Sequence, residues 1–330
     1  QQIDAYRMRE FPRSVGVSNG VFYFPAISPT GIGTVLWRTD GTAAGTRKVL
    51  GIANNEQGGD ASYELVDVNG TLFFAGFSTN NGLALWKINN ATGNAALVKD
   101  LYDGDFPALS NLAAVGNKLY FSDFTLANGA ELWVSDGTSA GTKMVKDLVP
   151  GTSGSTPRWI TAVGDVAYFL ASDDGRPFEL GDAALWKTDG TVAGTVRVRD
   201  FSDPKFTGNS GTFLTATGGT LFYSDGTDLW RSDGTPRGTV KITRIDGLPT
   251  FRGSTAVALG DTLFFTVRRS DGNGRDLYTA SATPPEAPGG LTVTGQQAAA
   301  AGGPIAAAMA ADAGVTLAWQ DHSTNETAFA

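Results

Sequence analysis

Residues 131–148 read ELWVSDGTSAGTKMVKDL, and close copies of this stretch recur along the chain. The copies are LWRTDGTAAGTRKVL at 36–50, LWKTDGTVAGTVRVRDF at 185–201 and LWRSDGTPRGTVKITRI at 229–245, whereas LWKINNATGNAALVKDL at 85–101 keeps the frame without the DGT. A period of about 40–50 residues with strand-like content is typical of a propeller blade. Six aromatic residues mark this period, at spacings of 44 to 53 residues: Trp37, Trp86, Trp133, Trp186, Trp230 and Tyr278.

Each repeat contains the signals of four short strands. In residues 111–148 an apolar run, a two-residue turn, an aromatic-rich strand, the ELW strand, the DGT turn and a last alternating strand follow one another. Two-residue turn pairs that tolerate positive φ favour type I′ hairpins. They recur six times: Asn19-Gly20, Asn69-Gly70, Gly116-Asn117, Gly164-Asp165, Gly218-Gly219 and Gly260-Asp261. The sequence therefore predicts an all-β fold, a six-bladed β-propeller of four-stranded blades over residues 1–280.

The sixth repeat, at 255–280, has only three strand signals before the segment TPPEAP. The N-terminus supplies an unassigned strand, Tyr6 to Phe11, which resembles the last strand of the other repeats. We expect this strand to complete the sixth blade, because closing the ring removes the open sheet edges of a linear array.

The Asp-Gly-Thr of the repeat is interpreted as a tight turn rather than as a ligand or metal site. The aspartate can accept bonds from backbone N–H groups two residues further on, and glycine supplies positive φ. This applies to Asp40, Asp136, Asp189 and Asp233. The aromatic anchors are expected to fill the core between blades.

These motifs resemble the bacterial ELWxxDGTxxGTxxVKD repeat proteins, which occur in large exported or cell-surface polypeptides. The resemblance covers residues 1–280. It implies a propeller and an extracellular setting, and it implies no single activity.

The net charge, the cysteine and histidine content and the apolar runs exclude several classes of function. The net charge is -8 without a basic block, which argues against a nucleic-acid partner. There is no cysteine, and the only histidine is His322, so residues 1–321 contain no thiol or histidine chemistry. No apolar run is long enough to span a membrane.

The C-terminal part differs from the repeats. Residues 281–290 (SATPPEAPGG) are typical of a linker. Residues 291–330 resemble the first two strands of a fibronectin type III domain, with an Ala-rich insertion at 298–311, and end before the third strand. Because such a sandwich needs about 100 residues, we expect either a fragment of a longer protein or a half domain that another chain completes.

Candidate site residues lie in the long, irregular loops, which alternate with the short, uniform turns and so share one face of a propeller. No catalytic residue is assigned. Ligand-binding candidates are Asp103, Asp105, Arg158, Trp159, Asp173, Asp174, Arg176 and Phe178. The oxygen-rich loops suggest calcium as a cofactor. Its candidate ligands are Asp173, Asp174, Glu179 and Asp182.

Three functions follow from these observations. The first is a non-catalytic, secreted or cell-surface module that binds a protein or glycan, or that is a structural part of an extracellular assembly. The second is a carbohydrate-active hydrolase or lyase that uses paired loop carboxylates such as Asp105 and Asp173. The third is a polymerising filament or matrix subunit, in which a neighbouring copy covers the half domain.

Overall fold

The computed structural model describes residues 15–27, 34–52, 64–77, 83–101, 109–175, 183–200, 213–224, 228–244, 256–268 and 275–281. Every regular element within these ranges is a β-strand. The predicted all-β fold is confirmed, and the strands form six antiparallel sheets, as expected for the blades of a six-bladed propeller. In the part of the chain that is described, no helix is suited to crossing a membrane.

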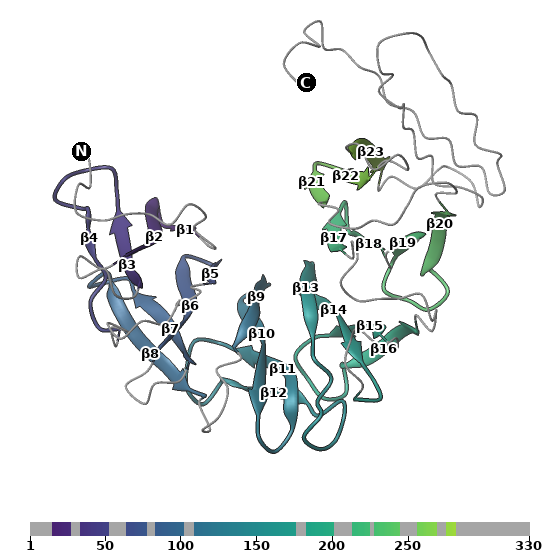
Figure 1. Cartoon of the computed structure of the whole chain (residues 1–330), viewed down its shortest axis with the longest axis horizontal. Helices are drawn as coiled ribbons and strands as arrows, with labels where there is room; N and C mark the ends of the chain where they lie inside the picture. Colours follow the sequence, from purple (N-terminus) through teal and green to yellow (C-terminus); the bar gives the residue numbers. More distant parts are fainter. Residues whose placement is uncertain are drawn as a thin grey trace, which may run out of the picture. The chain divides into compact units, whose positions relative to one another are not determined.

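The sheets are numbered in chain order, and in each one neighbouring strands follow one another in sequence (Figure 1). Sheet 1 comprises β1 (Gly16–Ser18), β2 (Val21–Ile27), β3 (Thr34–Thr39) and β4 (Arg47–Lys48). Sheet 2 comprises β5 (Leu65–Val68), β6 (Thr71–Phe77), β7 (Leu83–Asn89) and β8 (Asn94–Asp100). Sheet 3 comprises β9 (Ser110–Val115), β10 (Lys118–Thr125), β11 (Gly129–Ser135) and β12 (Lys143–Lys146). Sheet 4 comprises β13 (Arg158–Val163), β14 (Val166–Ser172), β15 (Ala183–Thr188) and β16 (Val196–Asp200). Sheet 5 comprises β17 (Phe213–Thr217), β18 (Thr220–Ser224), β19 (Asp228–Ser232) and β20 (Val240–Arg244). Sheet 6 comprises β21 (Ala256–Leu259), β22 (Thr262–Arg268) and β23 (Arg275–Ser281).

The first hairpin of each sheet turns where the sequence predicts it, but the turn type varies. Asn19-Gly20 and Asn69-Gly70 have positive φ at both residues, as type I′ requires. In three turns only the leading glycine has positive φ: Gly116, Gly164 and Gly260. The expected type I′ is therefore wrong for these three, because a glycine in the first position suits a type II′ turn.

In sheets 2 and 3 the second strand is a nearly continuous apolar run because both of its faces are covered. In β10, Leu119 and Phe121 pack into the core shared with sheet 2, while Tyr120 between them packs into the core shared with sheet 4. All three side chains are buried. The period-2 alternation therefore separates two apolar cores instead of a core and a solvent face.

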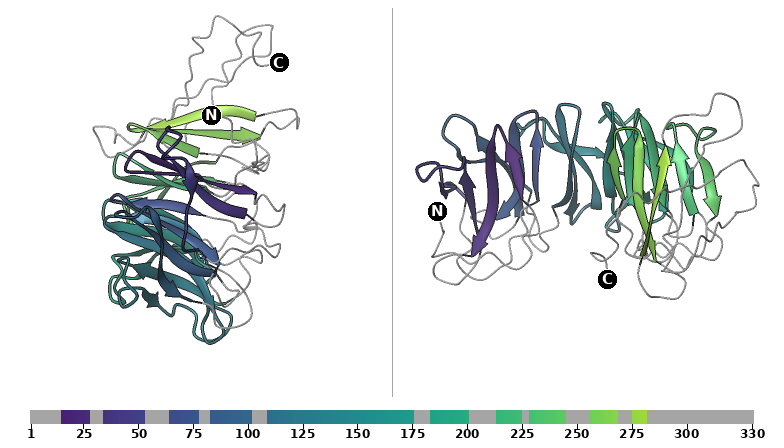
Figure 2. Two further views of the ribbon diagram at one scale, coloured as in Figure 1. Left: turned by 90° about the vertical axis from the view of Figure 1, so that its left-hand side faces the viewer. Right: turned by 90° about the horizontal axis from the view of Figure 1, so that it is seen from above.

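The chain divides into two compact units. The first comprises residues 1–177 and 185–197, and its successive sheets stack face to face around three apolar clusters, between sheets 1 and 2, 2 and 3, and 3 and 4 (Figure 2). The second comprises residues 178–184 and 198–330, with a cluster between sheets 5 and 6 around Phe222 and Phe265.

The aromatic anchors pack against these clusters. Trp86 is buried between sheets 1 and 2. Trp133, Trp186 and Tyr278 are partly buried against the clusters between sheets 2 and 3, 3 and 4, and 5 and 6. These four anchors are thus components of the inter-sheet cores, as expected.

Several predicted segments lie outside the described residues. These are the strand at 6–11, the linker beyond Ser281, which is the last residue of β23, and the fibronectin-like segment at 291–330.

Candidate functional site

The DGT turn between β11 and β12 is closed by its own polar groups. Asp136 Oδ1 accepts bonds from the backbone N–H of Thr138 (2.8 Å) and from its hydroxyl (2.7 Å). Thr138 Oγ1 in turn accepts the N–H of Gly141 (2.9 Å). The aspartate therefore holds the turn, as the sequence interpretation required.

The serine before the aspartate and the last threonine of the motif complete this network. Thr142 donates its hydroxyl proton to the carbonyl of Thr138 (2.6 Å), so Ser135 must donate to Thr142 Oγ1 across their 2.7 Å contact. Ser135 Oγ also accepts the N–H of Gly137 (3.0 Å). Sequence reasoning missed these two positions, although a serine or threonine precedes every DGT aspartate.

The second glycine of the motif is required by the position of the carboxylate. A Cβ added to Gly141 would lie 2.0 Å from Asp136 Oδ1, far inside contact distance. The same overlap exists in the other three turns, at 1.9 Å for Gly45, 2.1 Å for Gly194 and 2.0 Å for Gly238. The conserved frame of the repeat thus follows from one hydrogen-bonded turn that occurs four times.

The turn carboxylates are stabilised in their charged form. The hydroxyl and the N–H of the following threonine lower the pKa of Asp40, Asp136 and Asp189 below its usual value. These carboxylates are exposed but already accept two bonds on one oxygen, which fits a structural role.

A cation near the end of the last strand in sheets 2, 3 and 4 donates to the DGT turn of the next sheet. Lys99 of β8 donates to the carbonyl of Thr142 (2.7 Å), and its Nζ lies 5.7 Å from the ring centre of Trp133. Lys146 of β12 donates in the same way to the carbonyl of Thr195 (3.2 Å). In the second unit, Arg199 donates to the carbonyl of Thr239 (3.1 Å) and lies 4.5 Å from the ring centre of Trp230. We call these three residues the inter-sheet cations.

The predicted ligand-binding residues are only partly described. The expected loop position is wrong for Arg158 and Trp159, because both belong to the start of β13, where Arg158 pairs with Leu170. Asp173 and Asp174 follow β14. The other candidates lie outside the described residues: Asp103, Asp105, Arg176, Phe178, Glu179 and Asp182.

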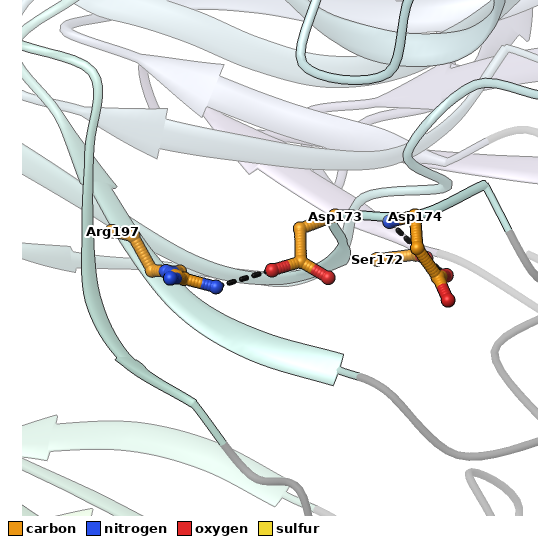
Figure 3. Close-up of polar contacts among 4 residues, drawn as sticks. All are labelled: Ser172, Asp173, Asp174 and Arg197. Atoms are coloured by element: carbon orange, nitrogen blue, oxygen red, sulfur yellow. Dashed lines mark hydrogen bonds and ion pairs between the residues drawn. The ribbon is translucent and has the colours of Figure 1, made fainter.

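The two described aspartates have partners in the chain (Figure 3). Asp173 forms an ion pair with Arg197, with both side chains partly exposed. Asp174 Oδ1 accepts the hydroxyl of Ser172 (3.0 Å). No group of three potential metal ligands occurs within the described ranges, and the calcium site, whose other two candidate ligands are Glu179 and Asp182, stays a prediction.

Trp159 has an unusual backbone. Its φ is 52°, in the left-handed region that side chains other than those of Gly, Asn and Asp rarely adopt. It lies in an irregular stretch of the β13–β14 pairing, between Arg158 and Thr161. In sheet 3, Asn111 occupies the equivalent second position of β9 with φ 57°, also in an irregular stretch. The bulge is therefore shared, whereas the large aromatic side chain is specific to sheet 4.

A buried carboxylate fixes the described connection between sheets 3 and 4. Glu131 accepts the N–H groups of Val149 (3.1 Å) and Ser155 (3.0 Å) and the hydroxyl of Ser155 (2.6 Å). Burial raises the pKa of Glu131, and these bonds oppose the shift. Sequence analysis did not single out Glu131, although among the tryptophan anchors only Trp133 has a glutamate two residues before it.

No protein-family profile matches this chain, and no curated protein matches it in sequence. Solved structures with a similar fold include the β-propeller domain of the Trilobed protease from Pyrococcus furiosus, with 11% identity, a TM-score of 0.48 and 86% of each chain covered. YjhT shows 12% identity and a TM-score of 0.44 over 85% of this chain and 96% of the other. The GH74 xyloglucanase from Xanthomonas campestris shows 14% identity and a TM-score of 0.48 over 84% of this chain and 46% of the other. At such low identities and TM-scores, these likenesses carry no argument about activity, ligand or partner.

Proposed function

We propose that this chain is a non-catalytic propeller module of a secreted or cell-surface protein, which binds a protein or a glycan or serves as a structural part of an extracellular assembly. The observation that carries the proposal is the closed hydrogen-bond network of the DGT turn. It occurs four times with the same partners, so the repeated polar residues maintain the framework. Recognition then falls to the opposite ends of the strands, where loops differ from sheet to sheet.

Arg158 and Trp159 are the described residues best suited to contact a ligand at those ends. Both are half-buried, and they combine a cation with a large aromatic surface. Aromatic and arginine side chains are the residue types that dominate binding energies at interfaces. The left-handed backbone of Trp159 is the kind of local strain that is often retained at functional sites. Asp173 and Asp174 flank this region after the next strand.

The test is a binding screen with a matched pair of variants. The full chain is screened against a glycan array and against surface-protein extracts of the source cells, and hits are titrated with purified ligand. Trp159→Gly removes the ring and suits the positive φ, so relief of the backbone strain offsets part of the lost packing and the protein should still fold. We expect the dissociation constant of the ligand to rise at least about tenfold in this variant, as for an interface hot spot.

Asn111→Gly is the control, because it makes the same backbone change at the equivalent position of sheet 3. It should bind like the unmodified chain. Unchanged binding by Trp159→Gly would remove Trp159 from the site. Conversion of a glycan to products, abolished by Asp173→Asn, would favour the enzymatic alternative instead.

We also propose that the sheets close into a ring in which residues 6–11 form the fourth strand of sheet 6. In the described part of the chain sheet 6 has three strands, which supports a fourth strand beside β23. Val257 and Leu259 on its first strand are 64% and 70% exposed, which supports closure of the ring against this face. Deleting residues 1–11 should lower the melting temperature by several degrees relative to a deletion of residues 1–3. Equal melting temperatures of the two deletions would exclude this closure.

A further inference from the structure

A hollow of about 600 Å³ lies at the turn end of sheets 2, 3 and 4, away from the ends that carry Trp159 and Asp173. Its walls come from the first hairpin turns of the three sheets and from the DGT turn of sheet 4. The lining residues are Asn69, Val115, Gly116, Asn117, Lys118, Tyr120, Asp165 and Asp189. Its volume is within the range of about 300–1,000 Å³ that is usual for small-molecule sites.

Tyr120 directs an unused hydrogen-bond donor into this hollow. The residue is 1% exposed, with its ring in the core between sheets 3 and 4, and no hydrogen bond of the described residues involves its hydroxyl. Burial, together with the negative charge of Asp189, raises the pKa of Tyr120 to about 12, so the hydroxyl keeps its proton. A Cβ on Gly190 would lie 2.7 Å from this oxygen, so glycine at that position keeps the space beside the hydroxyl free of a side chain.

Charged groups of both signs surround the hydroxyl. Lys118 Nζ lies 3.5 Å from the carbonyl oxygen of Asp189. The Asp189 carboxylate is ionised, because its threonine partner lowers its pKa. Asp165 contributes a second carboxylate above Gly116, where an added Cβ would lie 2.5 Å from Oδ1. The hollow therefore presents two donors, Tyr120 and Lys118, beside two carboxylate acceptors.

The equivalent place between sheets 2 and 3 lacks the two donors. Phe73 takes the position of Tyr120, and Thr71 takes that of Lys118, each counted from the preceding turn. Phe73 also approaches the DGT glycine of the next sheet, since its Cζ lies 3.1 Å from a Cβ placed on Gly137. Phenylalanine therefore packs at this position without a hydroxyl group. Of sheets 2 and 3, only sheet 3 has the hydroxyl.

The mixture of groups selects the chemistry of a ligand. An anion would be repelled by Asp165 and Asp189. A simple cation would be repelled by Lys118 and would leave the Tyr120 hydroxyl without an acceptor. A hydroxyl group both donates and accepts, so adjacent hydroxyls can satisfy the carboxylates, the ammonium and the phenol together. We propose that this hollow binds a sugar unit, with Tyr120 and Lys118 donating to its oxygens and Asp165 and Asp189 accepting from its hydroxyls.

This site is independent of the function proposed above, because it uses residues at the opposite end of the strands. The test is a titration of the full chain with neutral mono- and disaccharides, followed by saturation-transfer NMR and calorimetry. Tyr120→Phe should fold normally, as Phe73 does in sheet 2, and should weaken sugar binding roughly 2- to 10-fold, the effect of one lost hydrogen bond. Lys118→Thr, which reproduces sheet 2, should weaken it further than that.

The control is Val192→Thr, an exposed change in the same DGT turn but outside the hollow, which should bind like the unmodified chain. Absence of binding to every sugar tested would overturn the proposal. So would sugar binding that is unchanged in Tyr120→Phe and lost in Trp159→Gly, which would place the sugar at the other end. Binding of a lysine- or arginine-containing tripeptide, with no competition by sugars, would overturn it in favour of a peptide site.

Discussion

Sheets 2 and 3 close the hairpin between their third and fourth strands in different ways. In sheet 3 a turn of seven residues, 136–142, is held by Asp136 and the hydroxyl groups of three residues, Ser135, Thr138 and Thr142. In sheet 2 the turn has four residues, 90–93, and Asn89 Oδ1 accepts the N–H groups of Ala91 (3.0 Å) and Thr92 (3.3 Å). A neutral amide thus performs in sheet 2 the task of the aspartate in sheet 3.

The strands around the two turns are the same in design. Trp86 and Trp133 occupy equivalent positions, and each faces an aromatic residue of the preceding strand across the sheet, Phe74 and Phe121. The difference is therefore confined to the turn, and the blade tolerates either solution. The DGT is therefore one of two turn sequences that can connect the third and fourth strands of a sheet.

The largest effects on stability are expected when the tryptophan of either sheet is replaced. Trp86→Ala and Trp133→Ala should each lower the free energy of unfolding by about 3–5 kcal/mol, since each leaves a cavity in an inter-sheet core. Trp86→Ala should be the costlier, because it also removes the bond from Nε1 to the carbonyl of Gly76 (3.1 Å). Chemical denaturation of both variants measures this. A small loss of unfolding free energy in only one of the two variants would show that the tryptophans do not have equivalent roles in the two sheets.

A smaller effect is expected at the second glycine of the DGT turn. Gly141→Ala should destabilise the protein by about 1–3 kcal/mol, because its Cβ would overlap the carboxylate of Asp136. In an Asp136→Ala background the same change should cost less than about 0.5 kcal/mol, since the overlapping group is gone. A double-mutant cycle measures this coupling. Additive effects would contradict the turn geometry.

The smallest expected effect is a pH dependence of sheet 3 that sheet 2 lacks. A carboxyl group with a lowered folded-state pKa stabilises the fold above its unfolded pKa, about 3.9 for Asp. That contribution disappears as the pH falls through the folded-state pKa. Exchange protection of the Thr138 amide, corrected for intrinsic rates, should therefore decrease between about pH 5 and pH 2. The Thr92 amide, bonded to an asparagine, should not respond in this way.

Asp136→Asn provides the control, because it replaces the titrating group by the amide that sheet 2 uses. Its Thr138 amide should lose the acid dependence. If both amides lost protection together in the unmodified chain, global acid unfolding would explain the result and the local interpretation would be wrong.

Local patterns made most of this fold predictable from sequence. Turn pairs such as Asn69-Gly70, the apolar runs and the bonds of Asp136 depend on neighbouring residues, and periodicity identifies them. The hydrogen bond from Lys99 to Thr142 joins residues 43 positions apart. The steric overlap that excludes a side chain at Gly141 depends on where the Asp136 carboxylate lies in space. Neither appears as a pattern within one repeat.

The candidate sites were less predictable for the same reason. The sequence indicates Arg158 and Trp159 as a cation beside an aromatic residue in a predicted loop. The left-handed φ of Trp159 is not predictable from the sequence. Tyr120 resembles an ordinary core aromatic in KLYFSDF, and only the structure brings its hydroxyl next to Lys118, Asp165 and Asp189.

The inter-sheet cations have a consequence for how such chains change over evolutionary time. Sheets 3 and 4 each carry both halves of the connection, a DGT turn that accepts a cation and a last strand that donates one to the next sheet. Sheets 1 and 5 have Leu50 and Thr243 at the donor position, and the repeats that follow them lack the DGT. A duplicated copy of sheet 3 would therefore bring a DGT turn that accepts a cation and a last strand that donates one. Both new interfaces would keep a bond between a cation and a turn carbonyl.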